Sequence, residues 1–215
     1  PILYKVDRER DGASFTTRRV TAIQHGRAIF SLAASFQQRE AGFSHQDPLP
    51  DTIGPDGLLN EAEWHARAGD RIPEPWRSIW ASRDRPFEFR PVHPSDPFNP
   101  KALQPATQNW FRAEGSVPEG QALRAALFAY ATDMTLLDTC LLPHAVAWTD
   151  PQLQAASLDH AIWFHQEPDP SAWHLFDQTS PAASGGRGLN IGKIFARDGT
   201  LVATVVQEGL IRYRA

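Results

Sequence analysis

The clearest candidate for chemistry in this sequence is Asp133, a carboxylate inside a long apolar segment. The segment from Gly120 to Leu142 carries apolar residues on nearly every face, which is typical of a helix buried in a protein. A carboxylate taken out of water is costly unless it has a partner. A structural acid that caps a backbone turn would meet this requirement, and so would a catalytic base. The residues alone leave both roles open.

Two polar residues farther along the chain could act together with a carboxylate. Ser157 begins the run SLDH, although a serine at a strand edge usually has a structural role. No Gly-x-Ser-x-Gly motif surrounds it, so we do not expect an acyl-enzyme nucleophile there. Gln207 interrupts the apolar run Leu201–Val206, and a side chain that faces outward would explain it equally well.

Cofactor and metal chemistry receive no support from the sequence. The run Ser184–Gly192 (SGGRGLNIG) is similar to a dinucleotide-binding loop, but a strand follows it where a helix is required. We interpret it as a bulged turn. The eight histidines are scattered without a close pair beside a carboxylate cluster. We therefore expect neither a cofactor nor a metal.

Composition narrows the class of protein. The 215 residues are 41% hydrophobic and 21% charged, which is ordinary for a globular chain. A net charge of −4 with no basic block argues against nucleic-acid binding. Arg124, Asp133 and Asp138 argue against a membrane span over residues 120–142. Cys140 is the one cysteine, which fits a reducing compartment, so we expect a cytoplasmic protein.

The elements that would position these residues fall into three regions. Residues 1–45 contain three strand-like runs separated by Gly turns, which predict an antiparallel sheet. Of the 18 prolines, 12 lie between Pro48 and Pro118, so residues 46–105 are predicted to form a connector laid over a surface. Within the connector we expect a short helix over 58–68, capped by Asn60, and a short strand over 86–92.

Residues 106–215 are predicted to form an α+β domain. A strand over 107–114 leads into the long helix, and four strands follow it. These four are expected at Ala156–His165, Ala172–Pro181, Arg187–Arg197 and Leu201–Arg214.

An internal repeat links the first and last regions. A shift of 173 positions places Gly12 on Gly185, Gly26 on Gly199 and Leu3 on Phe176. The second copy has a strand and a long helix before its three strands, whereas nothing precedes Pro1 here. We therefore expect that the chain lacks the N-terminal part of its first domain.

Several segments resemble the acyl-CoA thioesterase II (TesB-type) family. They are DGASFTTRRVTAIQHGRAIFSLAASFQ, YATDMTLLDT, SLDHAIWFH, SGGRGLNIGKIFARDGTLVA and VVQEGLIR, in the order that the family has them. The resemblance implies a double hotdog, two antiparallel sheets each wrapped around a long helix. Residues 1–45 would be the C-terminal strands of an incomplete first hotdog, residues 46–105 the connector and residues 106–215 the second, complete hotdog.

The resemblance also implies an activity and a site. The chain would hydrolyse acyl-CoA to a fatty acid and coenzyme A, with Asp133, Ser157 and Gln207 as a hydrogen-bonded group that activates water. Backbone N–H groups near the N-terminal part of the central helix would stabilise the thioester oxygen. Hotdog proteins commonly associate through sheets or helices, so we expect a homo-oligomer.

Two other functions stay open at this point. One is a hotdog enoyl-CoA hydratase or dehydratase, which would use an Asp and a His near the start of the helix. The segment YATDMTLLDT offers no His for that role. The other is a non-catalytic acyl-CoA-binding protein.

Overall fold

The structure is a computed structural model that describes residues 1–82 and 85–214. It divides into two compact units, Pro1–His45 and Gln46–Ala215. We call them unit 1 and unit 2 and describe each by itself.

Unit 1 is an antiparallel sheet of three strands in the order β1–β2–β3. The strands are β1 (Leu3–Asp11), β2 (Phe15–Gln24) and β3 (Arg27–Gln37). The register places apolar side chains on one face, and the largest of them are exposed: Tyr4, Val6, Phe30, Leu32 and Phe36. The predicted sheet over residues 1–45 is confirmed, and one of its faces is apolar and accessible.

The three strands of unit 1 correspond to three strands of unit 2. The shift of 173 positions carries β1 onto residues 176–184, which lie within β8 (His174–Ser184). It carries β2 and β3 onto residues that belong almost wholly to β9 (Arg187–Ala196) and β10 (Leu201–Tyr213). Both sets pair as antiparallel meanders, which supports the internal repeat.

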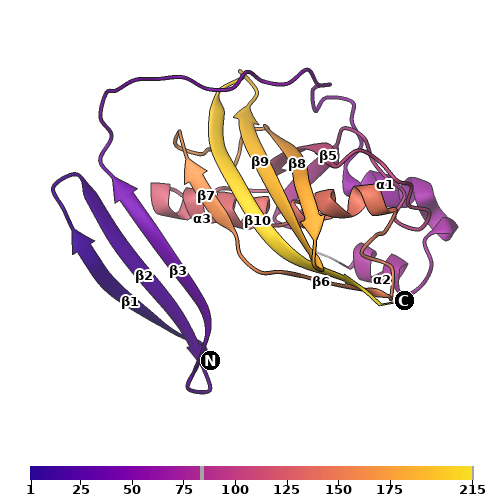
Figure 1. The fold of residues 1–215 in the computed structure, drawn as a ribbon. Helices are drawn as coiled ribbons and strands as arrows, with labels where there is room; N and C mark the ends of the chain where they lie inside the picture. Colours follow the sequence, from indigo (N-terminus) through magenta and orange to yellow (C-terminus); the bar gives the residue numbers. More distant parts are fainter. Residues whose placement is uncertain (83–84, 215) are drawn as a thin grey trace. The chain divides into compact units, whose positions relative to one another are not determined.

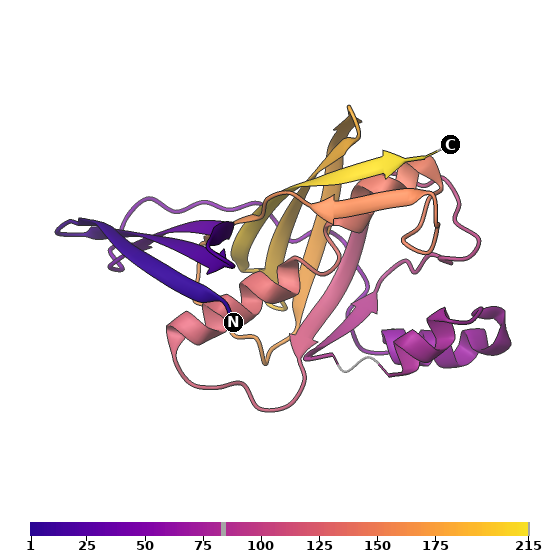
Figure 2. The ribbon, with the colours of Figure 1, turned by 90° about the horizontal axis from the view of Figure 1, so that it is seen from below.

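Unit 2 is built on a sheet of seven strands, whose pairs are antiparallel throughout the described residues. In spatial order they are β4 (Phe87–Pro91), β5 (Ala106–Ala113), β8, β9, β10 and β6 (Leu153–Ser157), and β7 (Ala161–Phe164) also pairs with β10. Figure 1 shows the helix α3 (Gln121–Thr132) crossing one face of β8, β9 and β10. In Figure 2 these strands bend over the helix.

The central helix is shorter than predicted. An uninterrupted helix over 120–142 is wrong, because α3 ends at Thr132 and a 3-10 helix, η2, occupies Leu137–His144. Thr132, the last residue of α3, has a side-chain hydroxyl that competes for backbone partners, because its Oγ1 donates to the carbonyl of Ala129 at 3.1 Å. The break follows Thr132 directly and makes Asp133 the C-cap of α3.

The helical segment is a core element. By length and composition alone Gln121–His144 could cross a membrane, yet 44% of its apolar window is buried within the protein itself. Phe128, Ala131 and Leu136 lie in the largest buried cluster together with side chains of β4, β5, β8, β9 and β10. The helix therefore fills the concave side of the sheet, as the sequence predicted.

The connector packs within unit 2. Its helix is α1 (Glu61–Ala68), and the predicted cap is confirmed because Asn60 and Glu63 form a reciprocal capping box. The helix η1 (Gly69–Arg71) and α2 (Trp76–Ala81) follow. Trp110 of β5 donates to the carbonyl of Ile53 at 2.8 Å, which fastens the proline-rich segment to the sheet.

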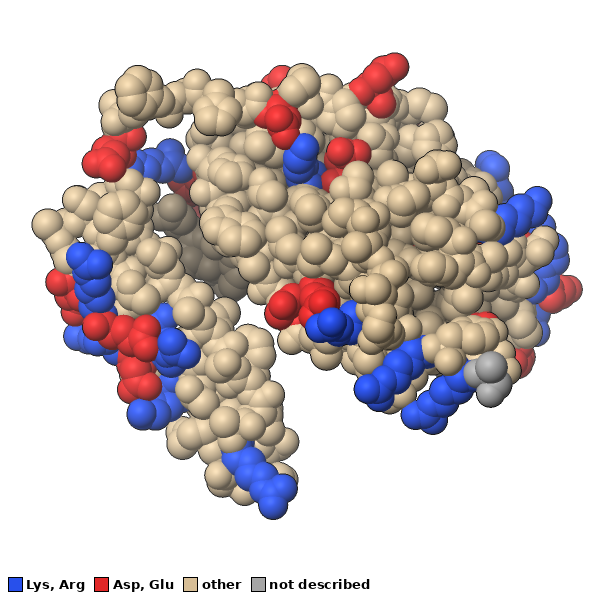
Figure 3. All heavy atoms as spheres, in the orientation of Figure 1, with Lys and Arg blue, Asp and Glu red and all other residues tan. Residues whose placement is uncertain are grey.

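Over β8–β10, the face shown in Figure 3 is mainly uncharged.

Candidate active site

Asp133, Ser157 and Gln207 meet at one point in unit 2. The Nε2 of Gln207 donates to Asp133 Oδ1 and, at 3.1 Å, to Ser157 Oγ. The hydroxyl of Ser157 lies 3.4 Å from the same Asp133 oxygen. The three side chains thus form a closed triangle of hydrogen bonds, although 74 positions separate Asp133 from Gln207 in the sequence.

The residues of this triangle differ in their exposure to solvent. Gln207 is fully buried, so the alternative of an outward-facing side chain is wrong. Asp133 and Ser157 are exposed in the chain as described, so the expectation of a deeply buried Asp133 is also wrong. The physical reason is the break in the helix, because the carboxylate sits where α3 ends and not in the middle of a continuous apolar helix. The triangle therefore has a buried amide at Gln207 and an accessible carboxylate at Asp133.

The chain after Asp133 is held by a buried amide of the sheet. Gln178 of β8 is fully buried, donates to Thr135 Oγ1 at 2.7 Å and accepts from Thr139 Oγ1 at 2.9 Å. Both threonines belong to the break or to η2. This amide fixes the segment that follows Asp133 against β8.

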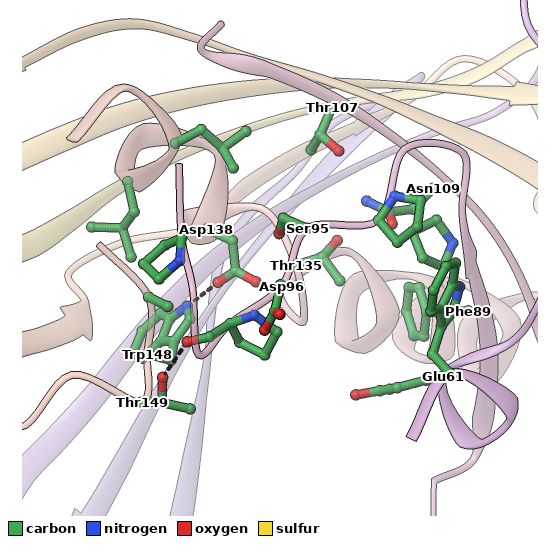
Figure 4. A pocket seen from close by; sticks show the side chains of 18 of the residues that line it. Glu61, Phe89, Ser95, Asp96, Thr107, Asn109, Thr135, Asp138, Trp148 and Thr149 are labelled. Atoms are coloured by element: carbon green, nitrogen blue, oxygen red, sulfur yellow. Dashed lines mark hydrogen bonds between the residues drawn. The ribbon is translucent and has the colours of Figure 1, made fainter. Parts of the chain in front are cut away.

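A cavity of about 960 Å³ opens beside Asp133 and Ser157, which both line it. Figure 4 shows Phe89 and Asn109 on one side of it and Asp138 and Trp148 on the other. Many of the lining side chains are apolar or aromatic, and they come from α1, α2, β4 and η2: Trp64, Trp76, Trp80, Phe89, Leu137 and Leu141. Such a cavity can hold an apolar ligand of considerable size.

A second carboxyl group, Asp138, lines the same cavity. Burial raises the pKa of Asp138 to about 7, and a hydrogen bond from the indole N–H of Trp148 opposes this rise. The bond is visible in Figure 4. Near neutral pH this part of the wall therefore changes between an uncharged and a charged state.

The expected source of oxyanion donors does not fit this geometry. The 12 residues of α3 span about 18 Å, and Asp133 lies at the C-terminal end. Backbone N–H groups at the N-terminus of α3 are therefore too far from Asp133 to act on the same carbonyl. The described residues contain no group of three or more His, Cys, Asp or Glu placed to hold a metal ion.

Comparisons with known proteins identify the family. Residues 80–210 match the family described as acyl-CoA thioesterase. Acyl-CoA thioesterase 2 of Haemophilus influenzae is 38% identical over 213 residues, which span 99% of this chain and 74% of that protein. This chain belongs to the acyl-CoA thioesterase family.

Solved structures agree with this assignment. The acyl-CoA thioesterase II TesB2 of Mycobacterium marinum aligns with a TM-score of 0.77 at 39% identity, covering 99% of this thioesterase and 74% of that chain. A protein of Alicyclobacillus acidocaldarius with a hot dog fold aligns with a TM-score of 0.75 at 19% identity, covering 100% of this chain and 74% of that one, and supports the fold alone. The predicted family, the hotdog fold and the thioesterase function are confirmed, and the hydratase alternative receives no support.

Three residues near the triangle were not connected with the candidate site in the sequence analysis. They are Gln178, Asp159 and His160. Gln178 lies among polar residues in the run DQTS, so alternation alone does not single it out. Asp159 and His160 fall in a run that was predicted as one strand, Ala156–His165, but the structure has two strands there, β6 and β7, with an interruption between them.

Proposed function

We propose that this thioesterase hydrolyses acyl-CoA by direct attack of a water molecule held at Asp133 and Ser157. The observation that carries the proposal is the hydrogen-bonded triangle of Asp133, Ser157 and Gln207 at the edge of a large apolar cavity. A carboxylate can accept a proton from water, and positioning of the reactants supplies much of the remaining rate.

The hydrogen-bond pattern assigns a separate task to each residue. Both N–H bonds of the Gln207 amide point to protein acceptors, so Gln207 orients its two partners and does not hold the water. Among the described residues, the hydrogen bonds to the Asp133 carboxylate reach Oδ1, which leaves Oδ2 for the water. Ser157 Oγ has a further lone pair, so the water can donate to Asp133 and to Ser157 and direct its own lone pair at the carbonyl carbon.

The reaction then proceeds in two steps. The water oxygen bonds to the thioester carbon while its proton passes to Asp133, which gives a tetrahedral intermediate. When this intermediate collapses, the carbon–sulfur bond breaks, the sulfur leaves as the thiolate of coenzyme A, and Asp133 returns the proton to it. The products are the fatty acid and free coenzyme A.

The cavity is a suitable binding site for the acyl chain. Asp133 and Ser157 line the same space as Leu137, Leu141 and Trp80, so a thioester at the triangle can extend its apolar arm between η2 and the connector. Burial of each methylene in such a space contributes about 0.8 kcal/mol. The polar coenzyme A portion then extends toward solvent.

Release of free thiol from a medium-chain or long-chain acyl-CoA tests the proposal. We expect steady release with the unmodified chain and a loss of about 10²- to 10⁴-fold in kcat for Asp133→Asn, which keeps the shape of the side chain. Asp150→Asn serves as the control, because Asp150 is a hydrogen-bonded carboxylate just before β6 that accepts the N–H of Gln152 at 2.8 Å and is not among the residues that line the cavity. Full turnover by Asp133→Asn would exclude the mechanism. Tight binding of acyl-CoA without thiol release would favour the non-catalytic alternative.

We also propose a cytoplasmic homo-oligomer with the three-region organisation described above. The free, buried thiol of Cys140 supports a reducing location. The boundary between residues 45 and 46 coincides with the division into two compact units. The exposed apolar face of unit 1 supports association, because contiguous apolar surface of this kind is commonly covered in an assembly. Sedimentation velocity measures the oligomeric state, and a monomer at micromolar concentration would contradict the proposal.

A further inference from the structure

The strands that carry Ser157 and Ile162 are separated by a β-bulge opposite the site. Ser157 pairs with Gly209 of β10, and Ala161 pairs with Val206. Three residues, 158–160, therefore lie opposite only two residues of β10, 207 and 208. One extra residue on one strand is the definition of a bulge, and bulges re-aim side chains beside active sites.

The bulge changes which side chains face the helix. In a regular strand, Ser157 and Ile162 would point to opposite faces, because they are five positions apart. Here Ser157 pairs with Gly209 and Ile162 with Val205, and both partners lie on the buried face of β10. Ile162 packs on the main core cluster while Ser157 reaches Asp133. Without the extra residue, either the core contact or the site contact would be lost.

Asp159 links the bulge by hydrogen bonds to β10, the strand that carries Gln207. The N–H groups of Leu158 and Asp159 both donate to the carbonyl of Glu208, at 2.9 and 3.3 Å. The Asp159 carboxylate accepts the N–H of Glu208 at 2.7 Å. The side chain thus replaces a hydrogen bond that a regular ladder would supply, at the residue directly after Gln207.

His160 ties the same bulge to the end of α3. Its Nε2 lies 3.2 Å from Oγ1 of Thr132, a fully buried residue that directly precedes Asp133. The hydroxyl proton of Thr132 is directed at the carbonyl of Ala129, so the imidazole Nε2 is the donor in this pair. Burial lowers the pKa of His160, which favours the uncharged ring, while the charges of Asp133 and Asp159 oppose the shift.

We propose that Asp159 and His160 are positioning residues that hold Ser157, Gln207 and Asp133 at their mutual distances. Asp159 sets the register between Ser157 and Gln207, and His160 sets the end of α3 through Thr132. This inference rests on the proposed function, since it assumes that the triangle activates water. Neither residue touches the reacting atoms.

Substitutions at Asp159 test whether this residue sets the register between Ser157 and Gln207. In Asp159→Ala we expect kcat to fall by about 10- to 100-fold with KM changed less than about twofold, because small displacements of reacting groups are costly. Asp159→Asn keeps an acceptor oxygen and should retain kcat within about threefold. The matched control is Asp198→Ala, which removes a carboxylate that accepts the N–H of Thr200 at 2.9 Å in the β9–β10 turn. Equal kcat values for Asp159→Ala and Asp198→Ala would overturn the assignment.

A double-mutant cycle tests whether the contact between His160 and Thr132 positions the end of α3. Thr132→Val and His160→Phe should each lower kcat by about 10-fold. The double variant should lose no more than either single variant, because the two substitutions remove the same contact. Thr132→Ser keeps the hydroxyl and should restore kcat. Losses that multiply, or a Thr132→Ser variant as slow as Thr132→Val, would exclude the role of this contact.

The outcomes separate this inference from the proposed function. If the unmodified chain releases no thiol, the proposed function fails. If the unmodified chain is active, Asp133→Asn is inactive and a folded Asp159→Ala variant keeps full kcat, only the positioning role fails. Near-ultraviolet circular dichroism establishes folding for each variant. If Asp159→Ala does not fold, Asp159→Glu decides, because its longer side chain keeps the charge and displaces the acceptor, so an unchanged kcat would overturn the proposal.

Discussion

Leu137 fills the space that a side chain at Gly209 would need. A Cβ built on Gly209 would overlap both terminal methyl groups and the Cγ of Leu137, and a Cβ on Gly188 would overlap Cys140. Two glycines of neighbouring strands therefore let η2 approach the sheet closely. Because Gly209 pairs with Ser157 and follows Gln207 by two positions, this close approach lies beside the site.

Gly209→Ala should push η2 away from β10. We expect a loss of about 1–3 kcal/mol in the free energy of unfolding, as for other overpacked positions, together with a lower kcat. Chemical denaturation and thiol release measure the two effects. Gly54→Ala, at a position with open space around it, should change neither quantity. Equal stability of both variants would contradict the close packing.

Gln178→Leu should destabilise the segment that follows Asp133. Removing the amide leaves Thr135 and Thr139 without their partner, and an unsatisfied buried hydroxyl costs about 1–3 kcal/mol. We expect a lower midpoint of denaturation and a reduced kcat. Ser180→Ala, which removes a hydroxyl of β8 that donates to the carbonyl of Leu189 at 2.7 Å and is not among the residues that line the cavity, is the control for kcat.

The buried imidazole of His174 should make the protein sensitive to acid. Burial lowers the pKa of His174 to about 4, while its bond to the Ala172 carbonyl opposes the shift. Between pH 6.5 and 4 the unfolded chain binds a proton that the folded chain does not, so stability falls as the pH falls. The slope is at most about 1.4 kcal/mol per pH unit. His174→Leu should flatten it, and an unchanged slope would contradict the assignment.

Asp138 should change the pH dependence of stability in the direction opposite to His174. Its pKa is raised to about 7 by burial, whereas an unfolded Asp titrates near pH 3.9. Between these values the folded chain holds a proton that the unfolded chain lacks, so stability falls as the pH rises toward 7. In Asp138→Asn this loss should disappear. The His174 and Asp138 effects overlap between about pH 4 and 6.5, so each must be measured in the other's variant.

Filling the cavity should alter the preference for acyl chain length. Ala147 lines the cavity and is only half-buried, so Ala147→Trp can add volume without disrupting the core. We expect kcat/KM to fall for long acyl chains and to stay unchanged for acetyl-CoA. Ala183→Trp, at an exposed position of β8, is the control. A uniform loss over all chain lengths would show that the acyl chain lies elsewhere.

The strands and the helix could be predicted from the sequence because their patterns are local. Alternation and Gly turns indicate β1, β2, β3, β8, β9 and β10, and the capping box at Asn60 marks the start of α1. The break after Thr132 could not be predicted, since the apolar pattern continues through it into η2. What stabilises the break is Gln178, a residue of another element.

The site could be predicted only in part for a related reason. The direction of Gln207 depends on the parity of β10, which is fixed by the contacts of Val205 and Gly209 with the core. The bulge at 158–160 shifts parity by one residue, and no pattern within SLDHAIWFH reveals it. Residues that bond to the backbone of a distant strand, such as Asp159, leave no local signal.

The place of β10 in the chain has a consequence for biosynthesis. Asp133 and Ser157 leave the ribosome before Gln207, and β10 is the strand on which β6, β7 and β9 all pair. At about 5–20 residues per second, synthesis from Ser157 to Tyr213 takes roughly 3 to 11 seconds. During that interval the nascent chain carries the carboxylate and the hydroxyl without the amide that orients them, so under the proposed mechanism it gains activity only after β10 has been made.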